Sequence, residues 1–282
     1  MDVEVICLLY GVPSLILSVF FLFFLSREEF KHSFYRNIQC DLLVNILAYS
    51  STWMSRFSLW SSTSLMMLQI YEKFYFAFHV CSFGVNFYFN LQATTVILMS
   101  IHRLTFTKFV NENEFWNKFY FPIYIAIVVV FFIFGFYVYL NKMVRPPYYD
   151  YKADAFLPTP VEPIPLEIFR KIFYYTSLTY LILISITNVL TVIMVKSKLA
   201  TIVQSENTQK IMRNLTLVAI IHSSVFLFVF IWQLFGVMFM ERSLFLASSY
   251  LFIDLCSLPL PYILLAFDGN VQMTLDMILL DD

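Results

Sequence analysis

Residues Phe119–Leu140 read FYFPIYIAIVVVFFIFGFYVYL and contain no charged side chain. The hydrocarbon core of a bilayer is about 30 Å thick and a helix rises about 1.5 Å per residue, so about 20 apolar residues are needed to cross it. This stretch meets that length by itself. It therefore predicts a helix that spans a membrane.

The composition of the whole chain supports a membrane protein. Of the 282 residues, 60% are hydrophobic and 13% are charged, whereas roughly 25% of the residues of an average soluble domain are charged. The mean hydropathy is +0.75. A soluble domain does not bury that much apolar surface. The net charge of -1, without a basic stripe, also argues against nucleic acid as a partner.

Six further apolar runs lie along the chain. Together with the first, they predict an all-α bundle of seven transmembrane helices that forms a single domain over residues 1–282. Their continuous aromatic and aliphatic character differs from the alternating pattern of barrel strands. The seven predicted spans are Val5–Leu25, Asn37–Met54, Phe74–Ile101, Phe119–Leu140, Ile172–Val195, Leu215–Met240 and Leu244–Phe267.

Two of these spans depart from the simple pattern. The second is the weakest, because Asp41, Asn45 and the polar cluster at residues 50–52 dilute it. The third is longer than one crossing requires, so we expect it to tilt or to extend beyond the membrane.

Charges at the two ends of the first span predict its orientation. Asp2 and Glu4 precede it, whereas Arg27, Lys31 and Arg36 follow it. Because positive charge accumulates on the cytoplasmic side, we expect the amino terminus outside. The absence of a basic region before the apolar run indicates a retained helix rather than a cleaved signal peptide.

The longest connection, Asn141–Arg170, is external in this topology and holds six of the ten prolines. We expect it to be extended rather than helical, and to act either as a lid over an outward-facing cavity or as a stiff spacer. The segments Arg103–Lys118 and Lys196–Arg213 are predicted inner loops. Their positive charge suits contact with anionic lipid or, alternatively, with a protein partner.

Motifs of catalysis and metal binding are missing from the sequence. His32, His79, His102 and His222 show no metal-binding spacing, and no nucleophile motif or glycine-rich phosphate loop occurs. We therefore expect no enzymatic activity, no metal and no cofactor.

Two carboxylates fall inside predicted spans. Asp41 lies in the second span and Asp254 in the seventh, where insertion of each costs about 2.5–3.5 kcal/mol at a helix centre, so both should face the bundle interior. Asn45 lies one turn after Asp41, which favours a hydrogen-bonded node there. For Asp254, a ligand contact and an interhelical node are equally open.

Polar groups also mark the third and seventh spans. Asn86 and Asn90 are four residues apart on one helical face, where they can line a cavity or bond neighbouring helices. Arg103 stands at the inner boundary of the third span, where a simple anchor at the membrane surface would also explain it. Near the end of the seventh span, Pro259 and Pro261 remove two backbone donors and predict a flexing point.

These features together resemble G-protein-coupled receptors. His102-Arg103-Leu104 stands where that superfamily has Asp/Glu-Arg-Tyr, and Pro259-Leu260-Pro261-Tyr262 fits the end of its Asn-Pro-x-x-Tyr element. His102 replaces the acid, and Leu258 replaces the polar residue before proline. The closer resemblance is to the nematode chemoreceptors called serpentine receptor class gamma, and it rests on the segments Ser33–Arg36, Tyr49–Trp53, Ser100–Leu104 and Pro261–Asp268.

The resemblance implies a chemosensory receptor for an external small molecule, which signals through a heterotrimeric G protein on the inner face. It further implies the plasma membrane, or ciliary membrane, of a sensory neuron. A small multi-pass transporter or ligand-gated channel is the alternative. The candidate site residues are Asn86, Asn90 and Asp254 for the ligand, His102 and Arg103 for the G protein, and Asp41, Pro259, Pro261 and Tyr262 for a conformational switch.

Overall fold

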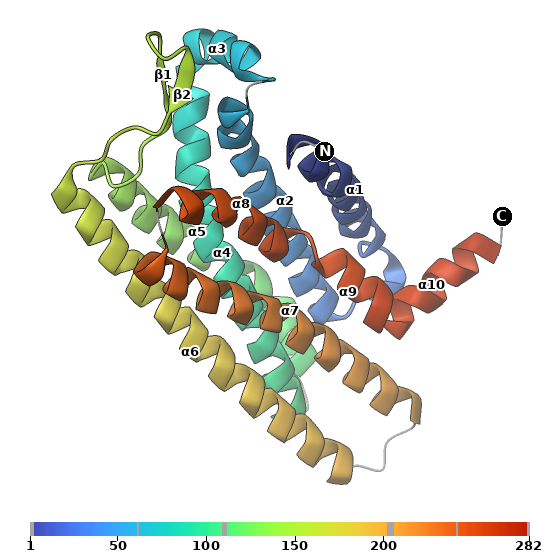
Figure 1. The fold of residues 1–282 in the computed structure, drawn as a ribbon. Helices are drawn as coiled ribbons and strands as arrows, with labels where there is room; N and C mark the ends of the chain where they lie inside the picture. Colours follow the sequence, from blue (N-terminus) through green and yellow to red (C-terminus); the bar gives the residue numbers. More distant parts are fainter. Residues whose placement is uncertain (1–2, 61, 109–111, 202–205, 241, 281–282) are drawn as a thin grey trace.

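The helices of the bundle follow the apolar runs of the sequence (Figure 1). The computed structural model describes residues 3–60, 62–108, 112–201, 206–240 and 242–280. Its elements are α1 (Val3–Phe24), the 3-10 helix η1 (Glu28–Phe30), α2 (Ser33–Leu59), α3 (Ser64–Lys73), α4 (Tyr75–Lys108), α5 (Glu112–Leu140), β1 (Tyr148–Asp150), β2 (Ala155–Leu157), α6 (Pro163–Thr201), α7 (Glu206–Phe239), α8 (Arg242–Ser257), α9 (Leu260–Phe267) and α10 (Gly269–Leu280).

Candidate membrane-spanning helices among the described residues can be identified by their length and apolar composition. Four helices are long and apolar enough to cross, within α1, α5, α6 and α7, and the α8–α9 pair makes a fifth if it is counted as one bent span. The faces of these helices that point away from the bundle are apolar and exposed. Leu9, Ile16 and Phe23 of α1, for example, are 61%, 64% and 70% exposed. This confirms an all-α membrane bundle.

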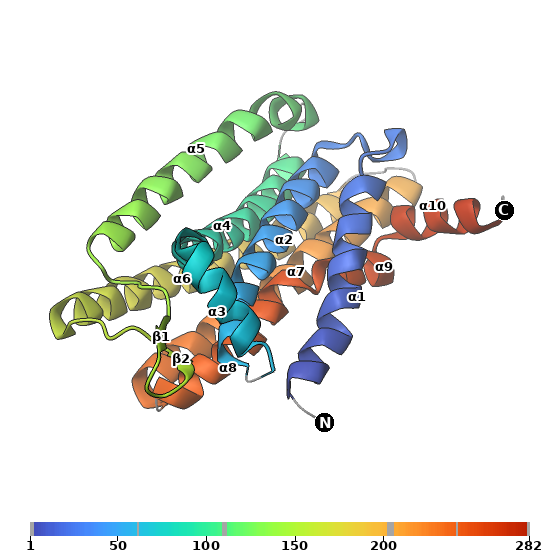
Figure 2. The ribbon, with the colours of Figure 1, turned by 90° about the horizontal axis from the view of Figure 1, so that it is seen from above.

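The second and third predicted spans correspond to α2 and α4, which lie in the middle of the bundle in both views (Figures 1 and 2). Neither belongs to these candidate crossings, because both carry polar side chains. Most of those side chains, including Asp41, Asn45, Gln92 and Thr95, are buried against neighbouring helices. The count of seven crossings stays a prediction for these two helices.

The two predicted inner loops are much shorter than expected, and their place on the inner side stays a prediction. Helix α4 continues to Lys108 and α5 begins at Glu112, while α6 continues to Thr201 and α7 begins at Glu206. Lys and Glu are good helix formers, so these helices extend past their apolar runs. Only positions 109–111 and 202–205 of the two predicted loops lie outside the described residues.

The proline-rich outer connection is extended in part, as expected, but its last residues are helical. Strands β1 and β2 pair antiparallel, with Tyr149 opposite Phe156. Pro163 and Pro165 lie in the first turn of α6 instead of in an extended segment, which is compatible with proline because first-turn backbone N–H groups have no helical partner. At the start of the connection, Lys142 adopts φ 55° and ends α5.

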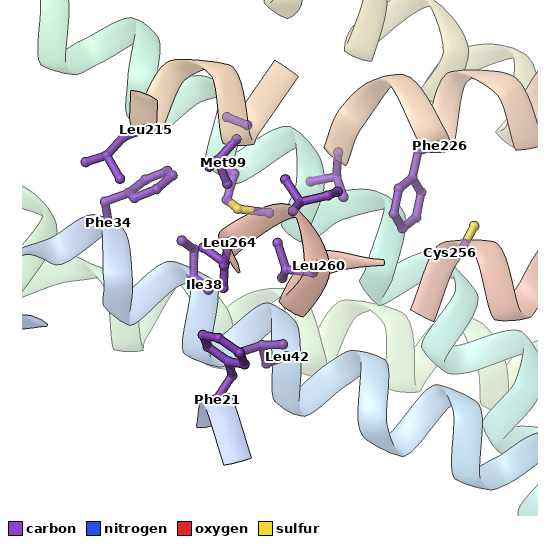
Figure 3. Close-up of a cluster of buried hydrophobic side chains, with 14 of the residues drawn as sticks. Phe21, Phe34, Ile38, Leu42, Met99, Leu215, Phe226, Cys256, Leu260 and Leu264 are labelled. Atoms are coloured by element: carbon purple, nitrogen blue, oxygen red, sulfur yellow. The ribbon is translucent and has the colours of Figure 1, made fainter. Parts of the chain in front are cut away.

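The main apolar core lies between α1, α2, α4, α7, α8 and α9 (Figure 3). Phe21, Leu42, Phe226, Leu260 and Leu264 in this core are fully buried. Lipid tails are as apolar as these side chains, so close packing and hydrogen bonds, rather than transfer out of water, must hold the helices together.

The seventh predicted span contains the expected bend. Helix α8 ends at Ser257 and α9 begins at Leu260, and the two segments meet at 42°. Pro259 lies in this break, which agrees with its missing backbone donor. After α9, helix α10 leads away from the bundle in both views (Figures 1 and 2).

The orientation in the membrane can be tested at the hairpin. Asp150→Asn with Lys152→Thr creates a glycosylation sequon next to the β1–β2 turn. The introduced amide keeps a side-chain oxygen where Asp150 Oδ1 accepts the backbone N–H of residue 152 at 2.9 Å, so the turn should be preserved. With the amino terminus outside, we expect this variant to gain one glycan, seen as an enzyme-sensitive mobility shift.

The native sequon at Asn214, near the opposite end of α7, is the internal control and should stay bare. Glycosylation of Asn214 without modification of the hairpin would show that the bundle has the inverted orientation.

Candidate functional site

A cavity of about 590 Å³ opens between the central helices at the end that carries the β1–β2 hairpin. The sequence predicts that this end faces outside, so it is called the outer end and the opposite one the inner end. The cavity volume is within the range of about 300–1,000 Å³ that is typical of small-molecule sites. Most of its wall is aliphatic or aromatic, with a few amides and hydroxyls. The wall comes from α2 (Ala48, Thr52, Ser55, Leu59), α4 (Ser82, Val85, Asn86, Phe89, Gln92), α6 (Phe169, Phe173), α8 (Ser249, Tyr250, Phe252, Ile253, Cys256) and the outer connection (Val144, Arg145, Pro147, Pro158).

The outer connection covers part of this cavity, as the lid interpretation predicts. Val144, Arg145 and Pro147 precede β1 and Pro158 follows β2, so both ends of the hairpin contribute to the wall. The Thr159 hydroxyl donates a hydrogen bond to the Pro146 carbonyl, which ties the two ends together.

A second apolar cluster holds the hairpin in place. Tyr149 and Phe156 pack against Met67 of α3 and Phe78 of α4, and the Phe78 and Phe156 rings stack at 5.7 Å. The hydrogen bond that the Tyr149 hydroxyl donates to Asp154 raises the pKa of Tyr149 to about 12. The phenol therefore keeps its proton, and this contact, at neutral pH.

The two asparagines of α4 lie at different depths. Asn86 lines the cavity, and its backbone carbonyl accepts a hydrogen bond from the Asn90 amide at 2.8 Å. Asn90 is 3% exposed, and its Oδ1 accepts a hydrogen bond from the Tyr180 hydroxyl at 3.0 Å. Asn86 is thus placed to contact a ligand, while Asn90 joins α4 to α6.

Gln92 connects the cavity to a buried polar network. It lines the cavity, and its Nε2 donates to Asn45 Oδ1 at 2.8 Å and to the Ser257 hydroxyl at 2.9 Å. Asn45 Nδ2 in turn donates to Asp41 Oδ2 at 3.1 Å. One amide at the cavity therefore links α4 with α2 and α8.

Asp41 lies at the centre of this network. It is fully buried, and it accepts hydrogen bonds from the Thr95 hydroxyl as well as from Asn45. His222 Nε2 of α7 lies 3.0 Å from Asp41 Oδ2. The node that the sequence suggested with Asn45 is present, and it extends to two further helices. The sequence spacing did not indicate the contact with His222, which lies 181 residues away.

Asp254 is engaged by α2 and α1 rather than open to the outer cavity. Arg56 donates from Nη1 to Asp254 Oδ2 at 2.9 Å and from Nη2 to Oδ1, and the Tyr10 hydroxyl donates to Oδ2. Both charged side chains are at most 4% exposed. Arg56 also donates to the Tyr250 carbonyl at 3.2 Å, which places this ion pair behind the cavity wall.

Arg56 holds Asp254 in this buried ion pair, and the sequence analysis did not identify it. The predicted second span ends at Met54 and leaves Arg56 outside it, whereas the residue belongs to α2 and is 2% exposed. The guanidinium also lies 5.2–5.6 Å from the ring centres of Tyr49, Trp53 and Tyr250. The aromatic residues around Arg56 and the lone carboxylate in the seventh span are the sequence signals that suggest such a pair.

Pro259, Pro261 and Tyr262 lie where α8 bends into α9. The Ser14 hydroxyl of α1 lies 2.8 Å from the Tyr262 hydroxyl. Pro259 and Tyr262, with Tyr10 and Asp254, line a groove of about 570 Å³ between α1 and the bent pair. Pro261 is buried. The groove leaves space beside the bend, which a change in bend angle requires.

His102 and Arg103 are enclosed at the inner end. Arg103 is 1% exposed, and its Cζ lies 3.6 Å from the centre of the Phe34 ring. His102 Nε2 lies 2.8 Å from the Ser33 hydroxyl, and its ring lies 5.0 Å from that of Trp116. A guanidinium under an aromatic ring is not a surface anchor, so the anchor interpretation of Arg103 does not fit.

The beginning of α10 closes the same end. The Tyr35 hydroxyl donates to Asp268 Oδ1 at 3.3 Å, and Asn270 Nδ2 donates to the Tyr35 hydroxyl at 3.1 Å. Asp268 also accepts the Asn270 backbone N–H at 3.0 Å, which caps α10. The start of α2 is thereby tied to α10 next to Arg103.

Among the described residues, no group of three or more His, Cys, Asp or Glu side chains is placed to hold a metal ion. The polar residues of the cavity and network can accept, donate and orient hydrogen bonds.

The buried ion pair makes a stability prediction. Removing one partner of such a pair costs about 3–5 kcal/mol, because a charge remains buried without compensation. We expect Arg56→Met to lower the melting temperature of the purified receptor strongly, and Arg56→Met with Asp254→Leu to recover most of the loss. Both melting temperatures can be measured with a dye that becomes fluorescent when it reacts with cysteine thiols exposed by unfolding.

The exposed pair Glu167–Lys171, at 2.8 Å, supplies the control. Lys171→Gln should leave the melting temperature unchanged, because surface pairs contribute little. A double variant no more stable than Arg56→Met would show that Asp254 tolerates the loss of its partner.

Comparison with known proteins agrees with this arrangement. The model of the Srg family chemoreceptors matches residues 5–275. Serpentine receptor class gamma-53 of Caenorhabditis elegans is 29% identical over 272 residues, which cover 95% of this chain and 88% of that receptor. Serpentine receptor class gamma-47 of the same organism is 25% identical over 291 residues, with the same coverage. A multi-pass bundle with an outer cavity and this family match over nearly its whole length lead to one conclusion: the chain belongs to the Srg family of chemoreceptors, which are serpentine receptors and not enzymes.

Proposed function

We propose that this chemosensory receptor binds an external small molecule in the cavity under the outer connection and transmits the binding event to a heterotrimeric G protein. The observation that carries the proposal is the position of Gln92. This residue lines the cavity and is also hydrogen-bonded within the buried network of α2, α4, α7 and α8.

The transmission step uses the exchange of hydrogen-bond partners. A ligand that engages Gln92 competes with its bonds to Asn45 and Ser257. Any change at Asn45 alters the hydrogen bonding of Asp41, and hence its contact with His222 of α7. A ligand shifts the receptor only as far as it favours one arrangement over the other. Asp41 is the centre of the switch in this proposal.

The inner end supplies the second arrangement. Arg103 is covered by Phe34, and α10 is tied to Tyr35. A G protein that contacts His102 and Arg103 therefore requires the start of α2, or α10, to move. The bend at Pro259 and Pro261, with Tyr262 beside the groove, is where we place the flexing.

Family membership favours a receptor over the alternative of a transporter or channel. We further propose that the receptor acts in the plasma membrane, or ciliary membrane, of a sensory neuron. Localisation of a tagged chain expressed from its own promoter in the animal tests this proposal.

The function is tested by screening secreted small molecules and odorants against the receptor in a heterologous cell with a calcium reporter. For an agonist found in this way, we expect Gln92→Leu to reduce the maximal response by at least tenfold at equal surface expression, because leucine cannot hydrogen-bond Asn45. Gln69→Leu on the exposed face of α3 is the matched control and should respond normally.

Two outcomes would contradict the proposal. An undiminished response of Gln92→Leu would show that the network does not carry the signal. A ligand-dependent current in cells without G-protein signalling would favour a channel.

A further inference from the structure

Among the described residues, Arg145 is a charged side chain in the cavity wall without an opposite charge beside it. It is the only charged residue in the cavity wall among the side chains that the structure describes. Within the same residues, its guanidinium has no hydrogen bond, ion pair or aromatic partner. The other arginine near the wall, Arg56, is already neutralised by Asp254.

The backbone at Arg145 is held by its surroundings. Pro146 and Pro147 follow it directly, so the backbone beyond it is restricted. The Pro146 carbonyl is bonded to Thr159, and the hairpin beyond is packed against α3 and α4. With this backbone held, only the rotamer freedom of the Arg145 side chain remains to be lost when its guanidinium binds a partner.

The rest of the cavity wall is mostly apolar, and it indicates which kind of molecule can fill the cavity. Val85, Phe89 and Phe173 contribute apolar surface to the same cavity wall as Arg145, and the Phe89 and Phe173 rings stack at 5.6 Å. A cavity of about 590 Å³ with this wall suits a molecule with an apolar body. A guanidinium next to such a wall is poorly hydrated and binds planar anions through two parallel hydrogen bonds.

We propose that the ligand of this receptor is an amphipathic acid, whose apolar body fills the cavity and whose carboxylate pairs with Arg145. This inference rests on the proposed function, because it assumes that the cavity is the ligand site. It adds the chemical class of the ligand and the residue that selects it. An amine of the same shape is rejected by the charge of Arg145, and a neutral analogue loses one charge-assisted hydrogen-bond pair.

Octanoate, octan-1-ol and octylammonium share one apolar body and differ in the head group, so they serve as probes. Each is titrated against the purified full-length receptor in lipid nanodiscs, and an apparent Kd is taken from the rise in melting temperature. For the natural sequence, we expect octanoate to bind at least tenfold more tightly than octan-1-ol, and octylammonium to bind most weakly. Arg145→Gln should abolish the difference between acid and alcohol, and Arg145→Glu should reverse the order in favour of octylammonium.

Lys152→Gln is the matched control, because this exposed lysine lies in the same connection outside the cavity wall. It should keep the preference for the acid, and it also reports any effect of the probes on the lipid. Equal binding of acid and alcohol by the natural sequence would overturn the inference, as would a preference that survives in Arg145→Gln.

A further variant separates failure of this inference from failure of the proposed function. Val85→Phe places a larger side chain in the cavity, so it should weaken all probes alike if the cavity is the ligand site. Probes that bind without a preference for the acid, and that Val85→Phe weakens, would leave the cavity in place and overturn only the role of Arg145. Binding that Val85→Phe does not alter would overturn both.

Discussion

A carboxylate that is fully buried among helices has no water to bind, and the arrangement of this bundle depends on how Asp41 is satisfied. Helices α2, α4 and α7 each bring a partner to it, namely Asn45, Thr95 and His222. In a lipid environment, apolar contacts do not by themselves distinguish one helix neighbour from another. The polar contacts therefore specify which faces of the central helices meet, and they place α2 and α4 inside the bundle.

The two buried carboxylates differ in a way that suits different tasks. Asp254 is held by a bidentate guanidinium and a phenol, which fixes α8 to α2 and α1. Asp41 is held by neutral groups and a histidine, whose contacts can be exchanged for one another at lower cost. We infer that Asp254 supports the outer half of the bundle, where the cavity must keep its shape. Asp41 then lies where a change of partners can be passed on.

Much of the fold could be predicted from the sequence, because apolar length and proline chemistry act locally. The run Phe119–Leu140 lies within α5, and Pro259 lies at the break between α8 and α9. For the outer connection, the sequence left two alternatives open, a lid over a cavity and a stiff spacer. The partners of Asp41 and Asp254 could not be predicted, because His222 and Arg56 lie 181 and 198 residues away from them. Similarly, the burial of Arg103 depends on Phe34 of another helix, which no local pattern reveals.

The central claim is that the network around Asp41 connects the outer cavity to the inner end of the bundle. Pulsed electron–electron double resonance, which measures the distance between two spin labels, tests it most directly. The labels are attached at Arg213→Cys near the inner end of α7 and at Met273→Cys on the exposed face of α10, in a cysteine-free background. With a saturating agonist, the account predicts that a second distance becomes populated. It also predicts that His222→Leu, which removes the α7 contact with Asp41, keeps a single distance while the agonist still binds. An agonist-induced shift of equal size in His222→Leu would contradict the account.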